Sequence, residues 1–154
     1  MLYLTMYIIK QLLLCFFLIF SVVIYAQTAA ELEVLLETAA VTNGQAARFV
    51  ISSSPGDNSA STEISAFEQA VTNGWLKNVN PDDKITLGKL SFLIMKSFDM
   101  KGGLMYLIFP GPRYAYRSLV SKSIIQGASD PAMLVDGERF LLILGNVLNA
   151  EGEK

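Results

Sequence analysis

Two stretches of this sequence share one order of residue types, and this internal repeat limits the folds that the chain can adopt. Residues 66–95 align without gaps on residues 115–144. Each stretch has an aromatic residue, an apolar pair, a polar loop with proline and aspartate, a glycine and an apolar run, in that order. A unit of this kind cannot bury its apolar side alone, so neighbouring units must pack together. We therefore expect repeated helix–loop–helix units.

A third, partial copy of the pattern precedes these two stretches. The second half of each copy opens with similar residues, at 41–45 (VTNGQ), 85–89 (ITLGK) and 134–138 (LVDGE). Thr42 and Gln45 also fit a capping box, in which two polar side chains three positions apart satisfy the backbone at the start of a helix. The sequence thus predicts two and a half units, with helices that begin near these residues.

The apolar residues recur at helical spacing through most of the chain, beginning with residues 28–40. No stretch shows the sustained alternation of a half-buried strand. Residues 101–112 (KGGLMYLIFPGP) form an apolar segment bracketed by glycine and proline, which fits one or two helical turns or an extended piece. The sequence predicts an all-α fold, in which helix–loop–helix repeats form one small domain after a signal peptide.

Residues 1–26 carry the pattern of an export signal. Lys10 is their only charged side chain, an apolar stretch follows over residues 12–24, and Ala26 supplies a small residue for cleavage. We expect residues 1–26 to be a signal peptide, so that the mature chain is exported and begins at Gln27 in the periplasm or cell envelope. Without cleavage, the whole largely apolar leader, which exceeds 18 residues, is long enough to span a bilayer and anchor the chain.

The remaining residues, 27–154, are expected to form a single helical domain, since this length suffices for one core and is short for two. A polar loop with proline and glycine at its centre separates the partial copy from the first full one. The expected segments are a partial repeat over 27–54, a first repeat over 63–99, an inter-repeat segment over 100–111 and a second repeat over 112–149.

The residue inventory excludes several kinds of catalytic site. The single cysteine, Cys15, lies in the predicted signal peptide, and the chain has no histidine. The mature part therefore lacks the residues of a disulfide framework, a thiol nucleophile, a zinc site or a Ser-His-Asp triad. Asp82, Asp83 and Asp130 lie in polar loops, where carboxylates commonly cap turns. With 12 basic and 14 acidic residues the chain lacks the basic excess that nucleic acid requires, and we expect neither an enzyme nor a cofactor.

One loop has a second interpretation, as a calcium site. Residues 78–85 (NVNPDDKI) resemble the start of an EF-hand or dockerin loop, in which oxygen ligands alternate along the chain. Such a loop needs a glycine at its sixth position and an acid at its twelfth, whereas this sequence has Asp83 and Lys89 there. We therefore expect a capped polar turn and no bound metal.

The repeated unit resembles the S-layer homology module. In that module a helix, an apolar pair, a loop ending near proline and aspartate, and a second helix recur, and the second helix typically opens with Ile-Thr-Arg-Ala-Glu. Ile85 and Thr86 match the first two of these residues, Glu138 matches the last, and neither copy has the arginine. The resemblance covers residues 66–148. It implies a non-catalytic scaffold that binds cell-wall polysaccharide or peptidoglycan in a groove between repeats.

Arg113, Tyr114 and Arg117 are the candidate ligand-binding residues. Two guanidinium groups beside a phenol ring bind sugars, carboxylates or acidic protein surfaces by stacking and paired hydrogen bonds. We expect these three side chains at the rim of the inter-repeat groove, in contact with wall polymer. The plainer interpretation is a helix that buries Tyr116 and leaves both arginines in solvent.

The apolar residues 104–109 support an alternative function, as a protein-interaction module of a periplasmic or outer-membrane complex. If this segment is exposed it favours such a partner site, and if it is buried it fills the core between the repeats. Membrane contact is expected only through the leader, in the case that the leader is not cleaved.

Overall fold

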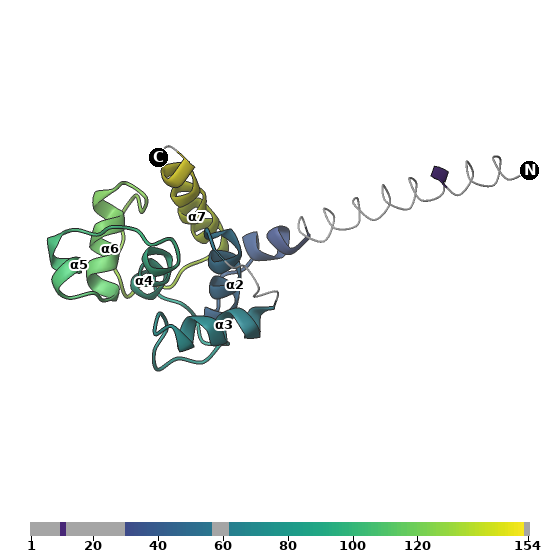
Figure 1. The fold of residues 1–154 in the computed structure, drawn as a ribbon, viewed down its shortest axis with the longest axis horizontal. Helices are drawn as coiled ribbons and strands as arrows, with labels where there is room; N and C mark the ends of the chain where they lie inside the picture. The colour runs from purple at the N-terminus through teal and green to yellow at the C-terminus, as the bar shows by residue number, and fades with distance from the viewer. Residues whose placement is uncertain (1–9, 12–29, 57–61, 153–154) are drawn as a thin grey trace, which may run out of the picture. The chain divides into compact units, whose positions relative to one another are not determined.

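The computed structural model describes residues 10–11, 30–56 and 62–152. The predicted signal peptide lies outside the described residues except at Lys10 and Gln11, and its expected cleavage site lies outside them too. The described chain is mostly helical and forms no sheet, which confirms the all-α class. No helix in these ranges is long and apolar enough to cross a membrane. The helices are α2 (Asn43–Ser53), α3 (Glu63–Thr72), α4 (Leu87–Ser97), α5 (Leu104–Ile108), α6 (Pro112–Ser121) and α7 (Gly137–Gly152) (Figure 1).

The chain divides into two compact units, Met1–Glu37 and Thr38–Lys154. In the first unit, a helical segment over residues 30–36 is described. The helix expected over 28–40 therefore ends earlier than the apolar spacing suggested. In the second unit the carbonyl of Thr38 accepts a hydrogen bond from the Gly137 amide at 2.9 Å, so this part of the chain no longer follows a helical path.

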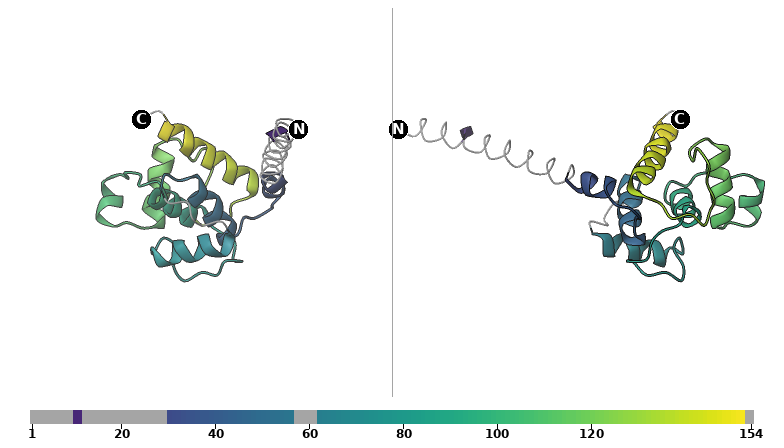
Figure 2. Two further views of the ribbon diagram at one scale, coloured as in Figure 1. Left: turned by 45° about the vertical axis from the view of Figure 1, so that its right-hand side comes forward. Right: turned by 180° about the vertical axis from the view of Figure 1, so that it is seen from behind.

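Helix α4 lies at the centre of the second unit (Figures 1 and 2). It packs against both α2 and α6, while α3 packs on α2 and α5 packs on α6. Because α4 has neighbours on both sides, it buries most of its side chains, including Leu90, Leu93 and Ile94. This burial explains why its sequence is apolar on nearly every face. Phe140 and Ile143 of α7 complete the same core.

Polar side chains mark the starts of α2, α4 and α7. The amide of Gln45 donates to Thr42 Oγ1 at 3.1 Å and the amide of Thr42 donates to Gln45 Oε1 at 3.0 Å, so the predicted capping box is confirmed. Thr86 and Asp136 likewise accept from the amide three residues later. These bonds satisfy amides that lack a partner inside the helix, which fixes where each helix begins.

The three chain segments that lead into these helices meet in a closed cycle of backbone hydrogen bonds. The Val41 amide donates to the Val135 carbonyl at 2.8 Å, and the Ile85 amide donates to the Val41 carbonyl at 2.9 Å. The Val135 amide donates to the Ile85 carbonyl at 3.3 Å, which closes the cycle. All three residues are fully buried. Each segment thus satisfies one backbone donor of the next in the dry centre of the fold.

The first turn of α2 donates a hydrogen bond to the loop that precedes α4, and the first turn of α4 donates one to the loop that precedes α7. The Gly44 amide donates to the Pro81 carbonyl at 2.9 Å, and the Gly88 amide donates to the Pro131 carbonyl at 2.8 Å. A Cβ at Gly88 would lie only 3.1 Å from that carbonyl oxygen, so any larger residue at this position would crowd the loop. In both contacts, the carbonyl of a loop proline accepts a hydrogen bond from the start of a buried helix.

Helices α3 and α6 are related by the offset of the sequence alignment at both ends, since Glu63 corresponds to Pro112 and Thr72 to Ser121. The turns after them match as well. Gly74 and Ser123 both have positive φ, 71° and 59°, and so do Asn78 and Gly127, at 55° and 76°. The same backbone path therefore follows both helices, and at each pair one member is a residue type other than glycine.

The ungapped register does not extend beyond these turns. The equivalent carbonyls of the next loop belong to Pro81 and Pro131, whereas the alignment paired Pro81 with Asp130. The residue that takes the place of Ile85 in the central cycle is Val135, whereas the alignment placed Leu134 there. The alignment is thus wrong by one residue from this loop onward, because the later loop contains one residue more.

Candidate functional site

The short helix α5 and the following helix α6 form the candidate site (Figure 1). They are joined by the Gly103 amide, which donates to Ser118 Oγ at 3.2 Å. The Ser118 hydroxyl itself donates to the Tyr114 carbonyl at 2.9 Å. This buried serine therefore connects the start of α5 to the middle of α6. The contact holds residues 104–109 against the helix that carries the three predicted ligand residues.

Tyr106 anchors α5 to the body of the fold. It is the only buried residue of this helix, and its ring packs edge-on against Phe92 of α4, with ring centroids 6.3 Å apart. A Cβ at Gly102 would overlap the Tyr106 ring, so the glycine before α5 leaves the space that the ring occupies. Burial raises the pKa of the Tyr106 phenol above its ordinary value of 10.0, and the nearby Asp99 carboxylate raises it further.

The other residues of the segment 104–109 face solvent. Leu104, Leu107 and Phe109 are 72%, 67% and 60% exposed, and Met105 and Ile108 are also exposed. The interpretation of this segment as a filler of the core is therefore wrong for every residue except Tyr106. Isolated exposed apolar side chains are common on protein surfaces, whereas a group of five in one segment makes it a candidate interaction site.

The structure brings two of the three predicted ligand residues to this apolar segment. Tyr114 and Arg117 line a shallow cavity of about 260 Å³ together with Leu104 and Met105. Arg113 is exposed but does not line the cavity. The sequence treated the arginine pair and the apolar segment as separate candidates, and the fold joins them into one surface. We call it the α5–α6 surface, which consists of the exposed side chains of Leu104, Met105, Leu107, Ile108, Phe109, Arg113 and Arg117 and the half-buried Tyr114.

The neighbouring Tyr116 has a structural role. Its hydroxyl donates to the Ser129 carbonyl at 2.8 Å, and it lies 2.7 Å from the Ser129 hydroxyl. Tyr116 is half-buried, so it holds the loop after α6 close to this helix. The plainer interpretation, which buries Tyr116 in the core, is correct only in part.

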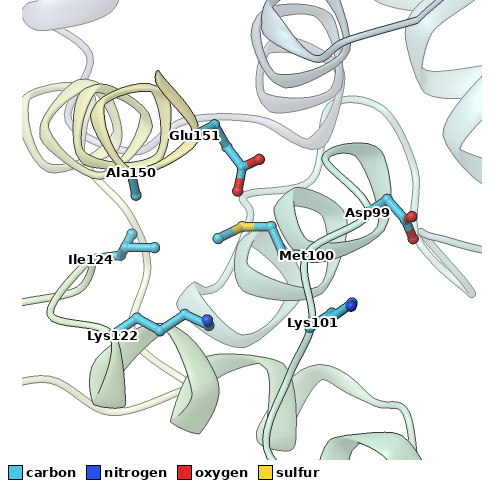
Figure 3. A pocket seen from close by; sticks show the side chains of 7 residues that line it. All are labelled: Asp99, Met100, Lys101, Lys122, Ile124, Ala150 and Glu151. Atoms are coloured by element: carbon cyan, nitrogen blue, oxygen red, sulfur yellow. The ribbon is translucent and has the colours of Figure 1, made fainter. Parts of the chain in front are cut away.

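A second cavity, of about 460 Å³, lies where the ends of α4, α6 and α7 approach one another (Figure 3). Met100 and Glu151 point toward its centre in the figure, and Lys122 runs along its edge. The sequence did not indicate this cavity, because its residues come from three segments with no common pattern. The lining residues are Asp99, Met100, Lys101, Lys122, Ile124, Ala150 and Glu151.

The loop carboxylates act as turn caps. Asp83 Oδ2 accepts from the Asn80 amide at 2.9 Å, and Asp130 Oδ1 accepts from the Ala132 amide at 2.7 Å. Both bonds stabilise the turn that contains the carboxylate, and Asp83 stands where a calcium loop requires glycine. Within the described ranges, no group of three or more His, Cys, Asp or Glu side chains is arranged to hold a metal ion.

Neither a protein-family model, nor a curated protein, nor a solved structure matches this chain. The resemblance to the S-layer homology module therefore rests on the residue pattern alone.

Proposed function

We propose that this chain is an exported, non-catalytic scaffold domain that attaches to a component of the cell envelope through its α5–α6 surface. One observation carries the proposal: the apolar residues around Tyr106 are exposed as a group, although Tyr106 itself is firmly packed. A segment held in place this way exposes its apolar side chains in the folded state and not only during local unfolding. Such exposure has a cost in water that contact with a partner removes.

The proposed scaffold consists of two and a half helix–loop–helix units related to S-layer homology modules. Three features support it. The first is the closed hydrogen-bond cycle of Val41, Ile85 and Val135. The others are the common sequence offset of both ends of α3 and α6, and the matching positive-φ turns that follow these two helices. In a repeat protein, each unit buries its apolar side on its neighbours. The buried backbone bonds between segments fit this arrangement. Export is inferred from residues 1–26 of the sequence.

A photo-cross-linking residue tests the attachment directly. We would place it at Leu107, or at Leu142 as the control, in the full chain produced in a bacterial host with its leader intact. Leu142 is 59% exposed on α7, so the two positions have similar solvent access. We expect adducts with an envelope component from Leu107 and none from Leu142. Equal yields, or no adduct at Leu107, would remove the α5–α6 surface as the attachment site.

A second candidate function is the binding of cell-wall polysaccharide, and the 460 Å³ cavity favours it. Its lining includes two cations, Lys101 and Lys122, two carboxylates, Asp99 and Glu151, and the apolar side chains of Met100 and Ile124. Sugars bind to such mixed surfaces through hydrogen bonds and through contact of their apolar faces. Retention on purified cell wall in detergent tests it with two variants, Lys122→Ala in the cavity and Arg113→Ala/Arg117→Ala on the α5–α6 surface. Wall binding in the cavity requires that only Lys122→Ala reduces retention.

A further inference from the structure

We propose that the envelope component recognised by the α5–α6 surface is an anionic phospholipid bilayer. The apolar side chains of α5 enter the interfacial layer of the membrane, and the cations beside them contact the lipid phosphates. This inference rests on the proposed attachment function and names its target. It departs from the expectation, drawn from the sequence, that only an uncleaved leader would contact a membrane.

The apolar part of the surface has the form of an interfacial anchor. Leu104, Leu107 and Phe109 project from a single helical turn and the residue after it, while Tyr106 fastens this turn from behind. In every view of the fold, α5 lies at the outer edge of the second unit (Figures 1 and 2). Membrane-binding segments use large apolar side chains in this way, with insertion only to the boundary between headgroups and acyl chains.

The charge around this apolar group complements a negative surface. Residues 100–129 contain four of the chain's twelve lysines and arginines and none of its fourteen acids, although the whole chain has a net charge of −2. All four cations are exposed; Arg113 and Arg117 belong to the α5–α6 surface, whereas Lys101 and Lys122 line the 460 Å³ cavity with Asp99 and Glu151. Arg113 and Arg117 are four residues apart on α6 and so share one face of the helix. Each cation near an anionic membrane surface strengthens binding to it, so this arginine pair beside the apolar residues favours lipids with anionic headgroups.

The same features favour a membrane over a protein partner. A protein that receives a protruding apolar turn needs a matching groove, and its acids would have to match the positions of Arg113 and Arg117. A bilayer adapts its shape to any protruding turn and presents phosphates at high density across its whole surface. Arg117 lines the same cavity as Leu104 and Met105, and Arg113 lies one helical turn away on α6, so a continuous negative surface against α5 contacts both arginines.

Amide hydrogen exchange tests the proposal on the full chain, whose leader holds it in the membrane in every preparation. The full chain is reconstituted into phosphatidylcholine vesicles and into phosphatidylcholine vesicles with added phosphatidylglycerol. The readout is deuterium uptake by the amides of residues 104–109, where the amides of Tyr106 and Leu107 donate to the Gly103 carbonyl. Because the leader is present in both preparations, a difference between them reports on the domain itself. We expect uptake to slow about tenfold or more with phosphatidylglycerol and little change without it.

Matched variants separate charge from fold. Arg113→Gln/Arg117→Gln removes two cations of the α5–α6 surface, whereas Lys77→Gln/Lys84→Gln removes two exposed cations elsewhere. The arginine variant should lose most of the protection, and the lysine variant should keep it. Leu107→Ser/Phe109→Ser should lose it as well. Unchanged circular dichroism and thermal unfolding of each variant show that it still folds.

Three outcomes overturn the inference: no protection of residues 104–109, equal protection on neutral vesicles, or equal loss in the two charge variants. If protection is absent while Leu107 still forms protein adducts in cells, the attachment function stands and its target is a protein. If both protection and adducts are absent, the attachment function fails together with the lipid assignment.

Discussion

Tyr106 packs its ring edge-on against Phe92, with ring planes inclined at 66° and centroids 6.3 Å apart. This contact connects the peripheral helix α5 to the central helix α4. Since Tyr106 is the only buried residue of α5, it supplies the apolar contact that positions the exposed segment, beside the hydrogen bond from the Gly103 amide to Ser118 Oγ. The sharpest predictions therefore concern Tyr106 and the surface that it supports.

The first prediction concerns the glycine that accommodates Tyr106. A methyl group at Gly102 would overlap the tyrosine ring, so Gly102→Ala must displace either the ring or the chain before α5. We expect a loss of about 1–3 kcal/mol in the free energy of unfolding, as for other overpacked sites. Gly103→Ala is the matched control, because nothing lies within 4 Å of a Cβ there. Urea denaturation of both variants measures the difference, and equal stabilities would contradict the packing of Tyr106.

The second prediction concerns the ionisation of Tyr106. Burial raises its pKa above 10.0 in the folded state, and the Asp99 carboxylate adds to the effect. An acid with a raised pKa stabilises the fold fully below its unfolded pKa, and this contribution is lost as the pH rises from about 10 toward the folded pKa. We expect one tyrosine to ionise late in an ultraviolet titration, and Tyr106→Phe to remove that step. Asp99→Asn should lower its pKa but leave it above 10.0, since burial remains.

The third prediction compares two glycines at the starts of buried helices. A Cβ at Gly88 would lie 3.1 Å from the Pro131 carbonyl oxygen, whereas at Gly44 the nearest atom would be the Pro81 carbonyl oxygen at 3.5 Å. We expect Gly88→Ala to destabilise the fold by about 1–3 kcal/mol through crowding. Gly44→Ala should be neutral or up to about 1 kcal/mol more stable, because alanine favours helices. Thermal unfolding measures both, and a reversed order would contradict the backbone contact at Gly88.

Helix positions were predictable to the extent that apolar spacing and polar caps coincide. Thr42 and Gln45 form the capping box at the start of α2, as the residue pattern indicated. Helices α3 and α6 keep the 49-residue offset of the sequence alignment. The central cycle of Val41, Ile85 and Val135 was not predictable, because it is made of backbone atoms that any residue supplies. The extra residue in the loop before Pro131 went unnoticed for a related reason, since polar loops tolerate insertion without a change of pattern.

The candidate site was predictable only in pieces. Arg117 and Tyr114 stood out by residue type and Leu104 by apolarity, but their common cavity depends on how α5 folds back on α6. That fold depends on the bond from the Gly103 amide to Ser118 Oγ, which joins distant positions of the sequence. The sequence also could not predict whether the apolar residues are exposed, because an apolar run bracketed by glycine and proline fits either a buried or a projecting turn.

Cross-linking yield across the surface is the measurement that tests the central claim most directly. Photo-reactive residues at Leu104, Leu107 and Phe109 would be compared in cells with the exposed control positions Ile64 and Leu142, at 65% and 59% exposure. We predict envelope adducts at the first three positions and none at the two controls, with yields reduced when Arg113→Gln/Arg117→Gln is added. Similar yields at all five positions would contradict this claim, because attachment would then not depend on the α5–α6 surface.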